Sequence, residues 1–522
     1  MAARSPGRAA ALVGAGIFLS RIAGLVRQRV LAHYLGLSDA ADALTAAFRI
    51  PNLLQNLFGE GVLSASFIPV YARLLGEGKE TEANRVAGAV GGLLAAAVSA
   101  VVLVGVVASG IVVDLLVPGF EGAKRDLTVT LVRVLFPGTG LLVLSAWCLG
   151  VLNSHHRFFL SYVAPVAWNL AIIIAAIAGG LRGGGEGVAI WVAWGAVAGS
   201  LLQVLVQLPT VLTLAHGLHF SMGAADPGVR SVALAFGPAV MGRGVTQVSA
   251  YVDGMIASLL GTSALAGLAN AQLLYTLPVS LFGMSVSASE LPAMAAEQGG
   301  HDERAQALRR RLEGGLVRIA FFVVPCAVAF LALGGVVAGA IFQTGRFTAA
   351  DSRYVWAILA GASLGLLAAT FGRLTASVFF ALGDTRTPLR AASVRVAVAA
   401  LGGWLAATRL PAVVGVDVSW GAAFLTTVSG LAAWLEYAFL RRALAARIGS
   451  VRLGMGRLMR LWGSAALAAA AAWPVQRLVV DLHPAAGAAA VLTVFAMVYG
   501  AATWTLGVPE ARALLARFER DG

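Results

Sequence analysis

Long apolar runs are the feature that most restricts how this chain can fold. Stretches long enough to cross the roughly 30 Å hydrocarbon core of a bilayer recur along nearly all of its 522 residues. Hydrophobic residues make up 59% of the sequence and charged residues only 12%, whereas soluble domains carry about 25% charged residues. We therefore predict an all-α polytopic membrane protein.

The apolar runs divide into about fourteen expected membrane helices. They lie near residues 10–35, 41–72, 86–118, 127–152, 160–181, 187–214, 230–261, 264–296, 314–343, 351–382, 388–409, 418–441, 459–480 and 485–507. Lys and Arg concentrate in alternate loops, such as "RLLGEGKETEANR" and "GDTRTPLR", on the side that also holds both ends of the chain. Because cytoplasmic loops carry the excess of cations, both termini are predicted to be cytoplasmic. The net charge of +13 is spread over loops, so no nucleic-acid partner is expected.

The sequence contains an internal repeat. "LFGEGVLSASFIP" begins at Leu57 and "LFGMSVSASELP" at Leu281, and "AHYLG" and "ASLLG" recur at nearly the same offset. The offset spans six helices, so both copies have the same orientation, as in transporters with parallel repeats. We predict two six-helix lobes, residues 1–220 and 221–445, followed by helices 13 and 14 and a cytoplasmic tail in residues 446–522.

The first helix carries three arginines in "LSRIAGLVRQRVLAHYLG". Arg29 lies near the outer end, where its side chain can reach the headgroups, but Arg21 is near mid-span, where an uncompensated charge is costly and usually functional. Positions 21 and 27 are about 120° apart on a straight helix, so both face one ligand only if the helix bends, for which Gly24 is the expected site. Arg21 and Arg27 are assigned to substrate binding.

Other polar positions fall inside later helices. Three on the second helix are also assigned to substrate binding: Arg49, Asn52 and Gln55. Four acids lie within or at the ends of helices: Asp42, Glu60, Asp253 and Glu290. Each acid has two interpretations, an ion pair with an arginine of a neighbouring helix or a role in transport; for Glu290 the second is a protonatable gate.

These residues indicate a binding site for an anion. Guanidinium groups bind phosphate bidentately and stay charged at any relevant pH, so an amphipathic ligand with a phosphate headgroup would explain cations inside a membrane protein. The sequence has no Walker loop, no HExxH and no Cys/His metal spacing, and no nucleophile–base pair stands out. We expect neither an enzyme, nor a cofactor, nor a metal site.

Ordered motifs from residue 19 to about 390 resemble those of the MurJ/MviN lipid II flippases. The motifs are "SRIAGLVRQRVLAHYLG", "DAADALTAAFRIPNLLQNLFGEGVLSASFIPVYA", "GVLNSHHRFFLSYVAPVAWN", "FGPAVMGRGVTQVSAYVDGMIAS", "QTGRFTAAD" and "FFALGDTRTPLR". The strongest is the P-N-L-L…F-x-E-G run of the second helix. The resemblance implies alternating-access transport of lipid II, the undecaprenyl-pyrophosphate-linked peptidoglycan precursor, across the bacterial cytoplasmic membrane. It also implies contact with membrane lipids and with the peptidoglycan synthesis machinery.

The resemblance extends to single residues. Arg21 and Arg27 match the arginines that face the substrate pyrophosphate, and Asp42 and Glu60 match acids that tune or gate the cavity. Asp253 matches an acid that ligates sodium in some members, but "AASVRVAVAALGGWLAA" lacks the Asn and Asp that complete that site.

Two family arginines are missing, because this chain has Gln55 on helix 2 and Leu273 on helix 8 at their positions. Arg243 lies about 20 Å inside its helix, too deep to reach the headgroups easily, and we expect it to supply the compensating cation or to pair with an acid. Flipping or export of another polyprenyl-linked oligosaccharide or amphipathic cargo is the alternative function. A non-transporting scaffold is a third possibility, which the retained buried charges disfavour.

Overall fold

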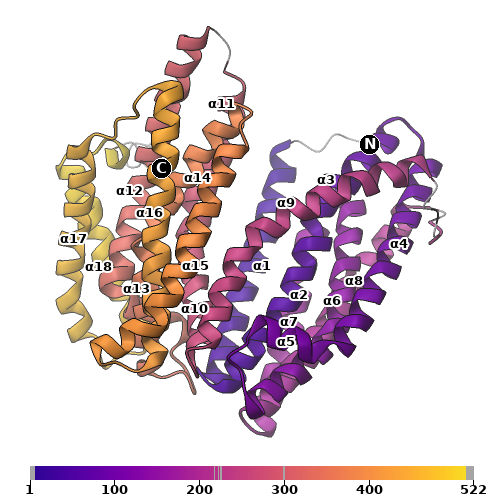
Figure 1. Cartoon of the computed structure of the whole chain (residues 1–522), viewed down its shortest axis with the longest axis horizontal. Coiled ribbons are helices and arrows are strands. Elements are labelled where there is room, and N and C mark those ends of the chain that lie inside the picture. Colours follow the sequence, from indigo (N-terminus) through magenta and orange to yellow (C-terminus); the bar gives the residue numbers. More distant parts are fainter. Residues whose placement is uncertain (1–5, 217, 222, 224–225, 298–299, 513–522) are drawn as a thin grey trace. The chain divides into compact units, whose positions relative to one another are not determined.

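The computed structural model describes residues 6–512 apart from 217, 222, 224–225 and 298–299, and its contacts divide the chain into two compact units. The first unit contains Met1–Leu265 together with Thr344–Phe347, and the second contains Ala266–Gln343 and Thr348–Gly522. The described residues are almost entirely helical (Figure 1). The boundaries predicted for the lobes, 220/221 and 445/446, stay a prediction.

The first unit is built from nine α-helices. In chain order they are α1 (Pro6–Leu35), α2 (Asp39–Phe58), α3 (Glu60–Gly76), α4 (Glu80–Val107), α5 (Ser109–Leu116), α6 (Gly122–Ser154), α7 (Phe158–Arg182), α8 (Glu186–Leu214) and α9 (Pro227–Ser258). Helix α6 lies in the middle, in contact with α2, α4 and α8, while α1 packs on α7 and α9 packs on α3 (Figure 1). The apolar stretch of α6 is accordingly far more buried inside the protein than those of α4 and α7.

Aromatic side chains fill the core of the first unit between α3, α4 and α6. Phe67, Tyr71 and Trp147 are almost completely buried, and the Trp147 indole N–H donates to the Ala87 carbonyl at 3.1 Å. Close helix approach in this core needs small residues: a Cβ at Gly91 would lie 2.9 Å from the Trp147 ring.

A four-residue segment from the loop after α12 completes the first unit. The Arg346 N–H donates to the His33 carbonyl at 2.8 Å, Thr344 Oγ1 lies 2.9 Å from His33 Nδ1, and Phe347 is buried. The segment Thr344–Phe347 of the "QTGRFTAAD" motif therefore docks on the end of α1.

The second unit contains the remaining helices. They are α10 (Ala264–Pro278), a π-helical turn (Val279–Met284), α11 (Ser285–Ala295), α12 (His301–Phe342), α13 (Ala349–Ser363), α14 (Leu366–Ala381), α15 (Arg386–Val414), a 3₁₀ turn (Val418–Trp420), α16 (Gly421–Ile448), α17 (Met455–Leu478) and α18 (Pro484–Thr505). Helix α16 packs against α13, α14 and α15, and the pair α17 and α18 packs against α12 (Figure 1).

The repeated motif marks an interruption of a helix in both units. In the first copy, Gly59 separates α2 from α3, and a Cβ there would clash with the Gln55 carbonyl. In the second copy, the π-helical turn Val279–Met284 separates α10 from α11. A helix is thus interrupted at the same motif in both copies, although in different ways, which supports the internal repeat.

The predicted class is confirmed: this is an all-α polytopic membrane protein. Nine helices within the described residues are long and apolar enough to cross a bilayer, and the α13–α14 pair, bent by 42°, would make a tenth. Taking each interrupted helix as one segment groups the described α-helices into the fourteen predicted segments. The number that cross the membrane stays a prediction.

Candidate functional site: a polar pocket between α2 and α9

An open polar pocket of about 300 Å³ lies between α2 and α9 in the first unit. Its lining consists of Arg49, Asn52, Gln55, Asn56, Ala250 and Tyr251. The four α2 residues lie on one face of that helix because Asn52 is three or four positions from each of the other three. The pocket thus brings together three of the residues that the sequence assigns to substrate binding.

Arg49 is held by α9. Its Nη1 donates to the Ala250 carbonyl at 3.3 Å, and the Tyr251 hydroxyl donates to the Arg49 carbonyl at 2.9 Å. The Arg49 guanidinium also occupies the space next to Gly254 where a Cβ would stand, and the Asp253 carboxylate attracts it electrostatically. Arg49 therefore connects α2 to α9, while the side-chain amides of α2 are not engaged by other described residues and can contact a ligand.

The two α1 arginines that were assigned to substrate binding have different surroundings. Helix α1 is uninterrupted from Pro6 to Leu35, and Arg21 is exposed on it, whereas Arg27 is partly buried. The Arg27 guanidinium lies 4.9 Å from the centre of the Trp168 ring of α7, a cation–π contact. Its Nε is buried, and none of the described residues accepts a hydrogen bond from it. Arg27 thus has unused donor capacity in an apolar environment.

Asp42 lies in a buried ion-pair network at the start of α2. Its carboxylate is fully buried, with Oδ2 2.6 Å from Lys124 Nζ, and the Ser263 N–H donates to the same oxygen at 2.9 Å. Lys124 also lies 2.9 Å from Asp39 Oδ1. These contacts join α2, the start of α6 and the loop after α9. Asp42 is therefore ion-paired, but with a lysine and not with the arginine that was expected; a gating role stays a prediction.

Glu290 belongs to the second unit and is paired. Its carboxylate lies 3.7 Å from Arg311 and 3.5 Å from Arg318, both on α12. Such contacts agree with the ion-pair interpretation and leave the protonatable gate untested. The side chains of Glu60 and Arg243, although their backbones are helical, lie outside the described residues.

Three further contributors were not identified from the sequence. Tyr251 and Asn56 line the pocket, and Trp168 supports Arg27. Tyr251 stands two residues before Asp253 in "SAYVDGM", so the signal was an aromatic residue with a polar tip next to an intramembrane acid. The carboxamide, phenol and guanidinium groups of this pocket can bind hydroxyls, amides and phosphates. Among the residues described, no group of three His, Cys, Asp or Glu side chains is placed to hold a metal ion.

Sequence comparison identifies a family. The family model for "Lipid II flippase MurJ" matches residues 31–483. A "Probable lipid II flippase MurJ" of Rhizobium meliloti (strain 1021) is 32% identical over 401 residues, which cover 74% of this chain and 73% of that protein. The "Lipid II flippase MurJ" of Burkholderia cenocepacia is 31% identical over 395 residues, with coverage of 74% and 75%.

Solved structures agree on the fold. A structure described as lipid II flippase MurJ in an inward closed conformation superposes with a TM-score of 0.75, covering 95% of this chain and 99% of the other at 21% identity. An inward-facing multidrug resistance transporter of the MATE family gives 0.63, covering 82% and 95% at 15% identity. At these identities the likeness is one of fold.

Proposed function

This chain belongs to the lipid II flippase MurJ family, and we propose that it moves lipid II from the inner to the outer leaflet of a bacterial cytoplasmic membrane by alternating access. The observation that carries the proposal is Arg27, a guanidinium on a membrane helix that packs on Trp168 and has a buried donor without a described acceptor. A pyrophosphate would supply acceptors and opposite charge at a donor for which the described residues supply no acceptor.

The α2–α9 pocket supports a cargo with more than phosphate. Asn52, Gln55 and Asn56 offer both donors and acceptors, and Tyr251 offers a hydroxyl. These groups suit the hydroxyls and amides of a glycopeptide better than a bare anion. The proposed division of labour is that α1 contacts the pyrophosphate and α2 contacts the sugar–peptide portion.

Complementation of a bacterium depleted of its own flippase tests this function. The chain should restore growth, and Arg27→Ala should abolish rescue without loss of membrane insertion. Arg29→Ala on the same helix is the matched control and should still rescue, because position 29 is near the headgroups. A stable, inserted wild-type protein that does not rescue would favour the alternative, a flippase or exporter for another polyprenyl-linked oligosaccharide or amphipathic cargo.

We propose that Arg243 supplies a cation in place of the two family arginines, whose positions are occupied by Gln55 and Leu273 in this chain. Helix α9 carries this residue deep in an apolar stretch, where a guanidinium must find an anion, a carboxylate or water. Arg243→Ala should abolish rescue, and adding Leu273→Arg should partly restore it. Full rescue by Arg243→Ala alone would refute the compensation.

The remaining assignments follow from the same proposal. The chain transports its cargo without covalent change, needs no cofactor, and has both termini in the cytoplasm. Its partners are lipid II, the surrounding membrane lipids and the peptidoglycan synthesis machinery. Terminal reporter fusions that are active only in the cytoplasm test the orientation.

A further inference from the structure

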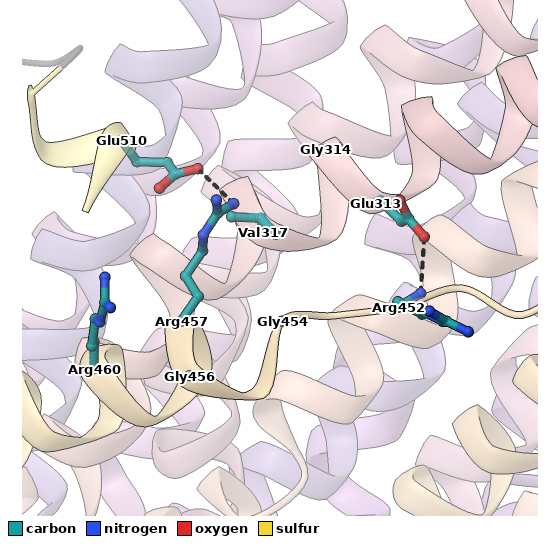
Figure 2. A pocket seen from close by; sticks show the side chains of 9 residues that line it. All are labelled: Glu313, Gly314, Val317, Arg452, Gly454, Gly456, Arg457, Arg460 and Glu510. Atoms are coloured by element: carbon teal, nitrogen blue, oxygen red, sulfur yellow. Dashed lines mark hydrogen bonds and ion pairs between the residues drawn. The ribbon is translucent and has the colours of Figure 1, made fainter. Parts of the chain in front are cut away.

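A second pocket, of about 490 Å³, opens in the second unit between α12, the loop before α17, and the chain just after α18 (Figure 2). Nine residues line it: Glu313, Gly314, Val317, Arg452, Gly454, Gly456, Arg457, Arg460 and Glu510. None of them was assigned a role from the sequence. An inference about this pocket does not depend on which cargo the chain transports.

Three of the lining residues are arginines within nine positions. Arg457 lies 3.8 Å from Glu510, a loose ion pair, and Arg460 donates to the Leu506 carbonyl at 3.3 Å. Among the described residues, no carboxylate forms an ion pair with Arg452 or Arg460. Figure 2 shows Arg457 and Arg460 rising from the start of α17 on the same side as Glu510, where both could reach one phosphate.

The pocket also contains two carboxylates, which accept hydrogen bonds and have the opposite charge to the arginines. Glu313 Oε1 accepts the Arg452 backbone N–H at 2.8 Å, which leaves most of its acceptor capacity unused. Glu510 Oε2 is buried, and no described residue donates to it. A ligand that carried only negative charge would be repelled by both carboxylates, so their presence favours a ligand with a cationic donor as well as an anion.

The glycines of this pocket leave open space in front of the backbone. A Cβ at Gly314, Gly454 or Gly456 would meet no atom within 4 Å. Packing within the protein therefore does not require glycine at these three positions, because a side chain there would not clash. A small polar headgroup would fit in the space that side chains would fill.

The other face of α17 is suited to lipid. Met455, Met459 and Trp462 are exposed apolar side chains, and their spacing of four and three residues places them on one stripe of the helix. The loop before α17 is among the cation-rich loops predicted to be cytoplasmic. The pocket thus lies at the predicted inner boundary of the membrane, on a helix whose opposite face is exposed to lipid.

We propose that this pocket binds the headgroup of a zwitterionic aminophospholipid of the inner leaflet. The phosphate contacts Arg457 and Arg460, the primary ammonium contacts Glu510, and the acyl chains extend from the pocket into the inner leaflet. Basic pockets at the inner ends of membrane helices bind lipid phosphates, and here the Glu510 carboxylate, next to Arg457, selects the ammonium. To contact it, the Glu510 carboxylate turns toward the pocket.

Native mass spectrometry of the purified full-length protein, titrated with lipids of identical acyl chains, tests the assignment. Phosphatidylethanolamine should bind roughly tenfold more tightly than phosphatidylcholine, whose quaternary ammonium has no N–H to donate. Phosphatidylglycerol, which has the phosphate but no ammonium, should also bind more weakly than phosphatidylethanolamine.

Two variants and a control locate the site. Arg457→Ala with Arg460→Ala should reduce phosphatidylethanolamine binding at least tenfold by removing charged hydrogen bonds. Gly456→Leu should do the same by filling the pocket, while its thermal unfolding stays unchanged because the new side chain meets open space. Arg477→Ala, at the far end of α17 where Arg477 stacks on Trp473, should bind like the wild type.

Three results would overturn the proposal. Equal binding of the three lipids would remove headgroup selection, and stronger binding of phosphatidylglycerol would make the site anion-specific. Tighter binding of undecaprenyl phosphate than of phosphatidylethanolamine would assign the pocket to a polyprenyl lipid instead. Unchanged binding by a folded Gly456→Leu variant would show that the lipid binds elsewhere.

Discussion

The α2–α9 pocket of the first unit and the α12–α17 pocket of the second both contain arginine, yet they present different chemistry to a ligand. In the first, Arg49 is engaged by the Ala250 carbonyl, the Gly254 backbone and the Asp253 charge, so the groups left open are uncharged amides. In the second, Arg457 and Arg460 make a loose ion pair and one carbonyl contact with the described residues, and the backbone around them is open. The number of cations in a pocket therefore says less about its ligand than the contacts those cations already make.

Arg49→Ala should have the largest effect, because Arg49 is part of the protein's own structure. It would remove a hydrogen bond from a charged donor, worth about 1.5–3 kcal/mol, and would leave Asp253 without its nearby cation. We expect a lower unfolding temperature in detergent and loss of rescue together. Arg49→Lys keeps the charge and should retain part of both.

A direct contact between Arg49 and the cargo would contradict this contrast between the two pockets. If Arg49 contacts the cargo directly, Arg49→Ala will lose lipid II binding while its unfolding temperature stays that of the wild type. The pocket would then resemble the second one, with a cation available to an anionic ligand.

A smaller effect is expected from Gln55, which faces the same pocket without holding the helices together. Gln55→Met removes the amide at similar size and should weaken lipid II binding several-fold, since one hydrogen bond is worth about 1 kcal/mol. Binding of undecaprenyl pyrophosphate, which has no sugar or peptide, should not change. Gln55→Arg, which makes this pocket more like the second, should instead tighten binding of undecaprenyl pyrophosphate.

If Gln55→Met weakened the binding of lipid II and of undecaprenyl pyrophosphate equally, this would contradict the assignment of α2 to the sugar–peptide portion. Measurement by native mass spectrometry keeps the two ligands on one scale. The same preparation gives the unfolding temperature, which should stay that of the wild type in both variants.

Most helices could be predicted from the sequence because a membrane helix is defined by the length of its apolar run. The ranges expected near 160–181 and 485–507 correspond to α7 and α18 to within two residues. The interruptions could not be predicted. Hydropathy continues across Gly59 and across residues 279–284, and the break at Gly59 depends on a close approach to Gln55 that only the folded helix reveals.

The part of the candidate site that lies on a single helix could be predicted from the sequence. Arg49, Asn52 and Gln55 share a face of α2, so their spacing alone groups them. Tyr251 and Trp168 come from other helices, and nothing local in the sequence says that α9 and α7 would supply the pocket wall and the partner of Arg27. Helix pairing in membranes depends on packing of small residues and on a few polar contacts, which a single sequence does not reveal.

The smallest effect is expected at Asp384, which connects α14 to α15 and supports the second pocket from a distance. Thr387 Oγ1 donates to its carboxylate at 2.7 Å, the N–H groups of Thr387 and Arg386 donate at 3.0 and 2.9 Å, and Arg447 Nη2 lies at 2.6 Å. The Thr387 hydrogen bonds, with help from Arg386 and Arg447, lower the pKa of Asp384 to about 2. Arg447 is in the last turn of α16, five residues before Arg452, so this contact holds one end of the loop that borders the pocket.

The pH dependence of this contact has a definite sign. A carboxylate whose pKa is lower in the folded than in the unfolded state, where it is about 3.9, stabilises the fold above the unfolded pKa and loses that contribution as the pH falls toward 2. Wild type should therefore unfold at a slightly higher temperature than Asp384→Asn at pH 5 to 7, and the gap should close between about pH 4 and 2. Thr387→Val should reproduce most of the difference, because Thr387 makes the largest contribution to the low pKa. A difference in unfolding temperature that stays constant down to pH 2 would show that Asp384 acts through packing and not through its charge. In that case, phosphatidylethanolamine binding at neutral pH should be the same in wild type and Asp384→Asn.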